Sequence, residues 1–292
     1  MILQQIINIS ITFSIYLLIS ISFSSVYSIS KFFNLAHAAF ITSGAYFTFF
    51  LSKQCNLPLS ISIGLSVLFT VILNVFLERC IFRTLRKKQS RSTILLLASL
   101  GIYVILQNLI SLIWGDSTRS IRTGEVKVGH ELWNAYITDT QIFIIVISFL
   151  LFFLTTLFYT FTKLGRQMRA VSSNEELTKI FGINSDSIIQ WAFSIGATIS
   201  AIAGVLVAFD TDMTPTMGFN LLLYGIVAMI IGGVGSLWGL VGGALLLAIT
   251  QHLGAYYIDN KWMDAIAYVI LILFLIWKPL GFSGQRLKKV EI

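Results

Sequence analysis

MTPTMGFNLLLYGIVAMIIGGVGSLWGLVGGALLLAITQHLGAYYI, residues 213–258, contains no Asp, Glu, Lys or Arg. A helix needs about 20 mostly apolar residues to cross the hydrocarbon core of a bilayer. Similar charge-free runs occupy residues 1–30, 32–52, 54–77, 92–115, 140–162 and 187–209. Because lipid offers no partner for open backbone groups, these runs predict an all-α, polytopic integral membrane bundle.

The composition agrees with this fold class and sets the expected number of spans. Of the 292 residues, 56% are hydrophobic and only 11% are charged, whereas a soluble domain carries about 25% charged residues. Nine windows predict spans: 6–28, 36–52, 57–78, 92–114, 140–162, 190–209, 220–235, 237–257 and 262–278. The stretch 220–257 is also compatible with one crossing and a re-entrant segment, which leaves eight. We expect residues 1–292 to form a single transmembrane domain.

The basic residues are unevenly distributed, and this predicts the orientation. Segment 79–91 has six Lys or Arg and no acid, and the C-terminal tail is also basic, whereas loop 115–139 has more acids than bases. Cytoplasmic loops of membrane proteins carry the excess of Lys and Arg. We therefore expect the N-terminus outside and the C-terminus inside. The alternative, an RNA-binding surface built on the net charge of +7, is not needed to explain the pattern, so no nucleic-acid partner is expected.

Motifs for catalysis or for ATP binding are missing from the sequence. It contains no G-x-x-x-x-G-K-[ST], H-E-x-x-H, C-x-x-C or G-x-S-x-G, and the three histidines are too scattered to predict a metal site. The carboxylates near predicted spans lie at their ends, at Glu78, Asp210, Asp212 and Asp264. An ion-coupled carrier often keeps a carboxylate within its spans. We therefore expect neither an enzyme nor a self-driven carrier, and no cofactor in this chain.

A polar island, residues 163–189, interrupts the apolar runs. Ser173 with Glu176 fits a capping box, and the apolar residues Leu177, Ile180 and Phe181 then follow at helical spacing. Gly182 is a natural helix stop. A short helix of this kind suits docking into a groove on a cytosolic partner. Packing back onto its own domain is an equally good explanation from the residues alone.

Two further features interrupt the spans with groups that lipid disfavours. Asn34 and His37 open a short apolar stretch that continues to Ser43 and Gly44, which suggests a broken helix facing a cavity. The simpler reading is that Asn34 caps a helix and that His37 bonds a neighbouring carbonyl.

The second feature is the glycine-rich stretch 231–243, which predicts a backbone break whose N–H groups can bind an anion. Close helix packing is the favoured explanation for most of its glycines, with ligand approach kept open at Gly232 and Gly233. The triplet 33–35, Phe-Asn-Leu, recurs at 219–221 around Asn220. The two copies are five spans apart, and an odd offset gives them opposite orientations in the membrane. The repeated triplet therefore suggests an inverted repeat.

Three motifs together resemble a known family, the LivH-type permease subunit of ABC importers for branched-chain amino acids, whose relatives carry urea, amides and other amino acids. The first is N-L-A-H at 34–37, followed by G-A-Y at 44–46. The second is L-G-R-Q-M-R-A at 164–170, followed by G-I-N at 182–184. The third is G-G-V-G-S at 232–236, followed by glycines at 239, 242 and 243. Their order and spacing agree along nearly the whole chain.

The resemblance implies an importer subunit in the bacterial inner (plasma) membrane. Its partners would be a second homologous, LivM-like permease, two cytoplasmic ATPase subunits that bind ATP and Mg, and an extracytoplasmic solute-binding protein. The island becomes the segment that docks on an ATPase, with candidate residues Gly165, Arg166, Arg169, Ala170, Glu176, Leu177, Ile180, Phe181 and Gly182. The expected solute pathway contains Asn34, His37, Ser43, Gly44, Asn220, Gly232 and Gly233. A stand-alone secondary transporter or channel is the rival from another class.

Overall fold

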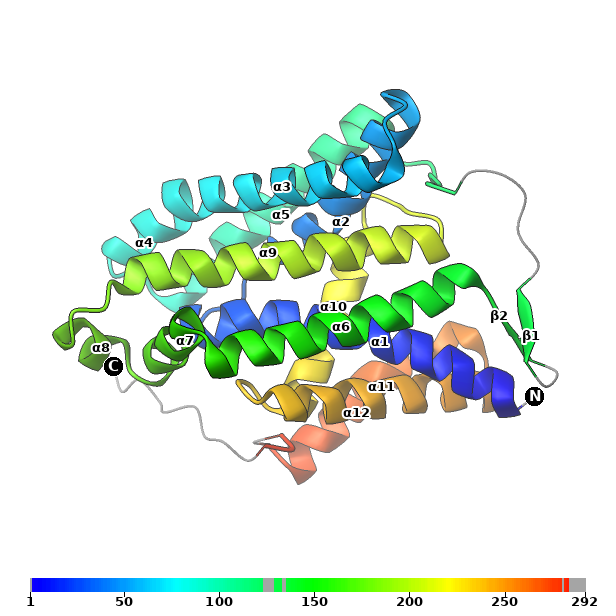
Figure 1. The fold of residues 1–292 in the computed structure, drawn as a ribbon. Helices are drawn as coiled ribbons and strands as arrows, with labels where there is room; N and C mark the ends of the chain where they lie inside the picture. The colour runs from blue at the N-terminus through cyan, green and yellow to red at the C-terminus, as the bar shows by residue number, and fades with distance from the viewer. Residues whose placement is uncertain (1, 123–128, 133–134, 280, 284–292) are drawn as a thin grey trace.

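The computed structural model describes residues 2–122, 129–132, 135–279 and 281–283. Within them the chain forms an elongated bundle of helices, with one small β-hairpin at one end (Figure 1). The helices are α1 (Ile2–Ser30), α2 (His37–Phe49), α3 (Leu59–Leu77), α4 (Arg83–Lys87), α5 (Ser92–Trp114), α6 (Asp139–Phe161), α7 (Lys163–Ser173), α8 (Glu175–Ile180), α9 (Ser185–Asp210), α10 (Met217–Gly232), α11 (Leu237–Tyr257) and α12 (Met263–Trp277). Each of the nine windows predicted from hydropathy falls on a helix.

Six helical segments in the described part of the chain have the length and apolar composition needed to cross a membrane: Ile2–Ser30, Leu59–Lys87, Ser92–Trp114, Asp139–Phe161, Ser185–Asp210 and Leu237–Tyr257. The helices α10 and α12 are shorter, and α2 is lengthened by a π-helical turn, Phe50–Gln54. A second π-helical turn, Glu78–Phe82, joins α3 to α4. The fold class is therefore confirmed as an apolar helical bundle, while the number of crossings stays a prediction.

Two helices form the centre of the bundle. In the most apolar part of α9, 72% of the residues are buried, and in that of α1 61%, against 22–28% for α3, α5 and α6. The exposed residues of these outer helices are mainly large and apolar. A helix that is apolar all round and buried belongs to the interior, whereas apolar residues on an outer face suit contact with lipid. Thus α1 and α9 are central, and α3, α5 and α6 surround them.

Small residues allow α2 to approach the central helix α9. A Cβ atom added to Gly204 would lie 2.0 Å from the carbonyl oxygen of Ile41, and one added to Gly44 would lie 2.6 Å from that of Ala201. No side chain larger than hydrogen fits at either crossing without a shift of backbone. Close packing through small residues is a common way for helices to associate where apolar burial gives little driving force.

The hairpin marks the end of the bundle where α1 begins. Its strands, β1 (His130–Leu132) and β2 (Ala135–Ile137), are antiparallel, and the Gln4 side chain accepts a hydrogen bond from the backbone N–H of Tyr136 at 2.8 Å. The hairpin is a small exception to the all-α prediction, in the loop between α5 and α6. The short helices α4, α7 and α8 lie at the opposite end (Figure 1).

Candidate functional site

The polar island folds into two short helices and the start of a third. Thr162 caps α7 by accepting a hydrogen bond from the N–H of Gly165 at 3.0 Å. The cap of α8 is Asn174, whose side chain accepts from the N–H of Leu177 at 3.0 Å. The predicted Ser173–Glu176 capping box is therefore wrong by one residue. Ser173 is still part of α7, and the chain becomes extended only at Asn174.

The apolar stripe of α8 points away from the bundle. Leu177 is 50% exposed, Ile180 81% and Phe181 74%, whereas Thr178 is buried on the other side of the helix. Gly182 ends the helix with a φ of 76°. These three side chains are therefore not packed back onto their own domain, which was one of the two expected arrangements. An exposed apolar cluster at the polar end of a membrane protein is typical of a surface that a partner covers.

The α6–α7 turn depends on a glycine. A Cβ at Gly165 would lie 2.3 Å from the carbonyl oxygen of Phe158 and 2.7 Å from the Cα of Tyr159. The first turn of α7 therefore folds tightly against the last turn of α6. Arg166, Arg169 and Glu176 are exposed, and Ala170 is half-buried.

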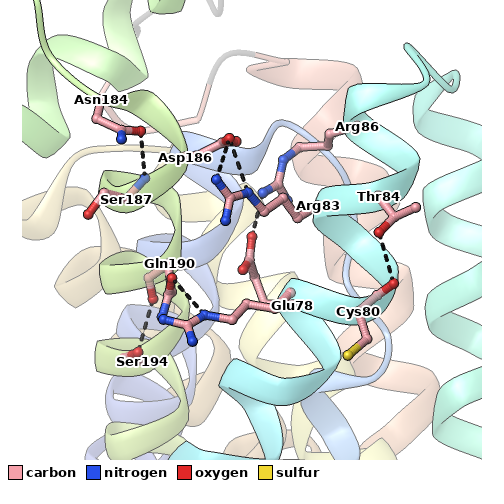
Figure 2. A network of polar contacts seen from close by, with 11 residues as sticks. Glu78, Cys80, Arg83, Thr84, Arg86, Asn184, Asp186, Ser187, Gln190 and Ser194 are labelled. Carbon is pink, nitrogen blue, oxygen red and sulfur yellow. Dashed lines mark hydrogen bonds and ion pairs between the residues drawn. The ribbon is translucent and has the colours of Figure 1, made fainter.

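The segment that follows α8 is held against α3 and α4 by polar contacts (Figure 2). Arg83 pairs with Asp186 in the first turn of α9 at 3.0 Å, and Arg79 donates to the side chain of Gln190 at 3.2 Å. Next to them Glu78 is fully buried and pairs with Arg86. The basic segment 79–91 thus contacts the helix that leads out of the island.

His37 joins three helices in the interior of the bundle. Its Nε2 lies 2.6 Å from the Ser22 hydroxyl of α1, and that hydroxyl donates to the carbonyl oxygen of Gly196 in α9 at 2.7 Å. Because the single hydroxyl proton of Ser22 is used on Gly196, His37 is the donor in the first bond. The partner of His37 is therefore a hydroxyl and not the carbonyl expected in the simpler reading.

Asn34 is buried, and neither its amide nitrogen nor its amide oxygen has a hydrogen-bond partner among the described residues. Its backbone oxygen accepts from the N–H of His37 at 3.2 Å, and the cap of α2 involves no side chain. The prediction that the Asn34 side chain caps a helix is therefore wrong. A buried, unpaired amide is costly, so this residue calls for an explanation beyond packing.

The other expected pathway residues named here lie on α2 and α10. Ser43 is buried in α2, Gly44 lies at the crossing with α9, and Asn220 is exposed on α10. The two copies of the Phe-Asn-Leu triplet also differ in setting, because residues 33–35 precede α2 whereas residues 219–221 lie within α10. The structure does not gather these residues into one cavity, and their part in a pathway stays a prediction.

The glycine stretch forms both a break and a close contact. The helix α10 ends at Gly232, and Gly233 has a φ of 92°. A Cβ at Gly239 would lie 2.1 Å from the Gly232 carbonyl oxygen, so α10 and α11 touch through their backbones. On the other side, the N–H of Phe282 donates to the carbonyl oxygen of Ile231 at 2.9 Å. These contacts agree with the packing explanation favoured for most of the glycines.

A half-open cavity with a volume of about 80 Å³ lies between α1, α6, α7 and the start of α11. Arg169, one of the candidate coupling residues, lines it. The other residues that line this cavity were not predicted as site residues from the sequence. The available signal was the serine-rich second half of α1, where Ser24, Ser25 and Ser28 all line the cavity.

Comparison with known proteins gives the family. The family model described as "Branched-chain amino acid transport system / permease component" matches residues 5–275. The high-affinity branched-chain amino acid transport system permease protein LivH of Escherichia coli (strain K12) is 31% identical, over 97% of this chain and 96% of that protein. The corresponding permease protein BraD of Pseudomonas aeruginosa is also 31% identical, with the same coverage.

Among solved structures, PsaBC from Streptococcus pneumoniae in complex with Fab aligns over 96% of this chain and 93% of that chain, with a TM-score of 0.51 and 12% identity, which is a likeness of fold. The sequence matches extend over nearly the whole length of both proteins, and the family model covers the first helix through the last. The chain therefore belongs to the family of permease components of branched-chain amino acid transport systems.

Proposed function

We propose that this protein is the permease subunit of an ABC importer that carries branched-chain or other amino acids across the bacterial inner membrane, where it forms the translocation pathway. The observation that carries the proposal is the exposed apolar stripe of α8, on a segment that follows the family pattern. An importer permease needs such a surface because its energy comes from a separate protein. A urea or amide importer is the alternative within the same class.

The proposed assembly contains a second homologous, LivM-like permease, two cytoplasmic ATPase subunits and an extracytoplasmic solute-binding protein. ATP and Mg would be bound by the ATPase subunits, so this chain needs no cofactor of its own and is not an enzyme. ATP-driven movement of α7 and α8 would shift the bundle between outward-facing and inward-facing states, because the ATPase binds the two states with different affinity.

We propose eight or nine crossings, with the N-terminus outside and the C-terminus inside. The hairpin and the start of α1 would then be outside, and α4, α7 and α8 in the cytoplasm. The inverted repeat also remains a proposal. It is supported by the similar roles of α2 and α10, two short helices that follow long central helices and meet where Gly218 approaches the carbonyl oxygen of Ala38.

A self-driven carrier is the rival function. Of the carboxylates near span ends, Glu78 is paired with Arg86, Asp212 lies 3.8 Å from Arg122, and Asp264 accepts from the Tyr224 hydroxyl. None of these three lies in the middle of a spanning helix, which weakens the case for ion coupling through them.

Uptake of radiolabelled L-leucine, L-valine and urea by proteoliposomes tests the proposal. The complete complex is expected to import an aliphatic amino acid only when ATP and the binding protein are supplied, and an ATPase variant without hydrolysis is expected to abolish uptake. Uptake by this chain and its permease partner alone would establish the carrier instead. Import of urea but not of leucine or valine would select the urea alternative.

A further inference from the structure

The cavity beside α7 combines one positive charge with several hydroxyl groups. Arg169 of α7 lines it, and no carboxylate lies within ion-pair distance of this side chain in the part of the chain that the structure describes. The Tyr159 hydroxyl of α6 is buried close to Ser25, yet it makes no hydrogen bond of normal geometry to a described residue. A guanidinium and a phenol hydroxyl among the lining residues suit an anionic oxygen group such as a carboxylate.

The α1 wall of the cavity offers hydrogen-bond acceptors. The Ser25 hydroxyl donates to the carbonyl oxygen of Ile21 at 2.7 Å, and the Ser172 hydroxyl donates to that of Ser28 at 2.8 Å, which ties α7 to α1. Because these hydroxyl protons are already used, the two hydroxyl oxygens can act toward a ligand only as acceptors. Ser24 also lines the cavity. Acceptors of this kind suit an ammonium group.

The remaining wall is apolar. Ile21 and Ile29 of α1, Met168 of α7 and Leu237 of α11 line the cavity. Ligand sites usually combine an apolar lining with a few placed polar groups. No acidic side chain lines this cavity, so a ligand with a net positive charge would meet Arg169 without compensation. The chemistry that fits all three walls is a carboxylate, an ammonium and an aliphatic side chain in one small molecule.

We propose that this cavity is an inward-facing binding site for a zwitterionic aliphatic amino acid, with the carboxylate on Arg169 and Tyr159. This inference rests on the proposed function, because the ligand is taken to be the transported solute. It adds to that function a place where the solute binds. The ligand would touch α7 directly. Arg169 would then serve both the amino acid and the coupling segment.

Equilibrium binding of tritiated L-leucine to the purified full complex, without nucleotide or binding protein, tests the site. We expect Arg169→Gln and Tyr159→Phe each to weaken binding about tenfold, the size expected for one hydrogen bond to a charged group. L-leucinamide, which lacks the carboxylate, should not compete. The matched control is Tyr256→Phe, which removes a hydroxyl from an exposed tyrosine outside the cavity and should bind as the unchanged protein does.

Two other outcomes would overturn the site. One is equal leucine affinity in all variants, or equal competition by leucinamide. The other is a phospholipid that copurifies with the unchanged complex and is lost in Arg169→Gln, without leucine binding, because a headgroup phosphate would then be the anion. The same preparation is tested for ATP-driven leucine uptake. If the complex imports leucine and the variants bind it with unaltered affinity, only the proposed site is refuted. If the complex imports no aliphatic amino acid, the proposed function is refuted.

Discussion

The guanidinium of Arg83 donates two hydrogen bonds to one carboxylate oxygen of Asp186, at 3.1 Å from Nε and 3.0 Å from Nη2. This contact joins the start of α4 to the first turn of α9, near the end of the island (Figure 2). Both side chains are about one-third exposed, at 36% and 33%. The contact therefore links the start of α9 to α4, and water can also satisfy both groups.

The two ion pairs of this region are predicted to differ in their effect on stability. Asp186→Asn should cost less than about 1 kcal/mol, because exposed pairs are screened by solvent. Arg86→Gln should cost about 3–5 kcal/mol, because it leaves the carboxylate of Glu78 buried without a partner. Thermal unfolding of the purified complex compares the two. The double change Glu78→Gln with Arg86→Gln should recover much of the loss, and equal stability of both single variants would contradict this account of the pair.

Glycine at the α2–α9 crossing is predicted to be essential for packing. Gly204→Ala places a methyl group 2.0 Å from the carbonyl oxygen of Ile41, and overpacking of this kind costs about 1–3 kcal/mol. Gly64→Ala and Gly101→Ala serve as controls, since nothing lies within 4 Å of either position. The yield of monodisperse complex and its thermal midpoint should fall only in Gly204→Ala. Equal behaviour of all three variants would show that α2 and α9 are not in close contact.

The substitution Asn34→Leu tests whether the amide of Asn34 serves transport or only the structure. Because both amide atoms are buried without partners, an apolar residue of similar size should raise the free energy of unfolding by about 1–3 kcal/mol. If the amide serves the solute pathway, uptake falls at the same time. Thermal unfolding and uptake are measured on one preparation. A stable Asn34→Leu complex with normal uptake and selectivity would remove Asn34 from the pathway.

Single cysteines test the orientation. In a chain without Cys55 and Cys80, Thr118→Cys should react with a membrane-impermeant maleimide in intact cells, and Lys88→Cys should react only after permeabilisation. The reason is that Lys88 lies at the α4 end of the bundle with the basic segment, whereas Thr118 follows α5 towards the hairpin end. The reverse labelling pattern would invert the topology.

The helices could be predicted from the sequence and the contacts between them could not. Charge-free runs predict where helices form, because in lipid the backbone N–H and C=O groups must form their hydrogen bonds within the same segment. The α8 cap was missed by one residue, since Ser173 and Asn174 are both good capping residues and only the backbone conformation distinguishes them. The cavity was missed because its walls come from α1, α6 and α7, and one sequence does not show which faces of these helices meet.

We propose that the exposed apolar stripe of α8 couples this permease to an ATPase. Phe181→Asp leaves the fold intact, since Phe181 is 74% exposed. It removes a docking contact of about 1–3 kcal/mol if the residue is an anchor. The matched control for Phe181→Ala is Phe153→Ala, because Phe153 is also largely exposed, at 60%, but lies on the outer face of α6. Phe153→Asp is not used, because it would place a charge on a face that suits contact with lipid.

Copurification of the ATPase subunits with the tagged permease, together with solute-stimulated ATP hydrolysis, is the most direct measurement. We expect both to fall in Phe181→Ala, to be nearly abolished in Phe181→Asp and to be unchanged in Phe153→Ala. Normal copurification and normal stimulated hydrolysis in Phe181→Asp would show that α8 is not the coupling surface.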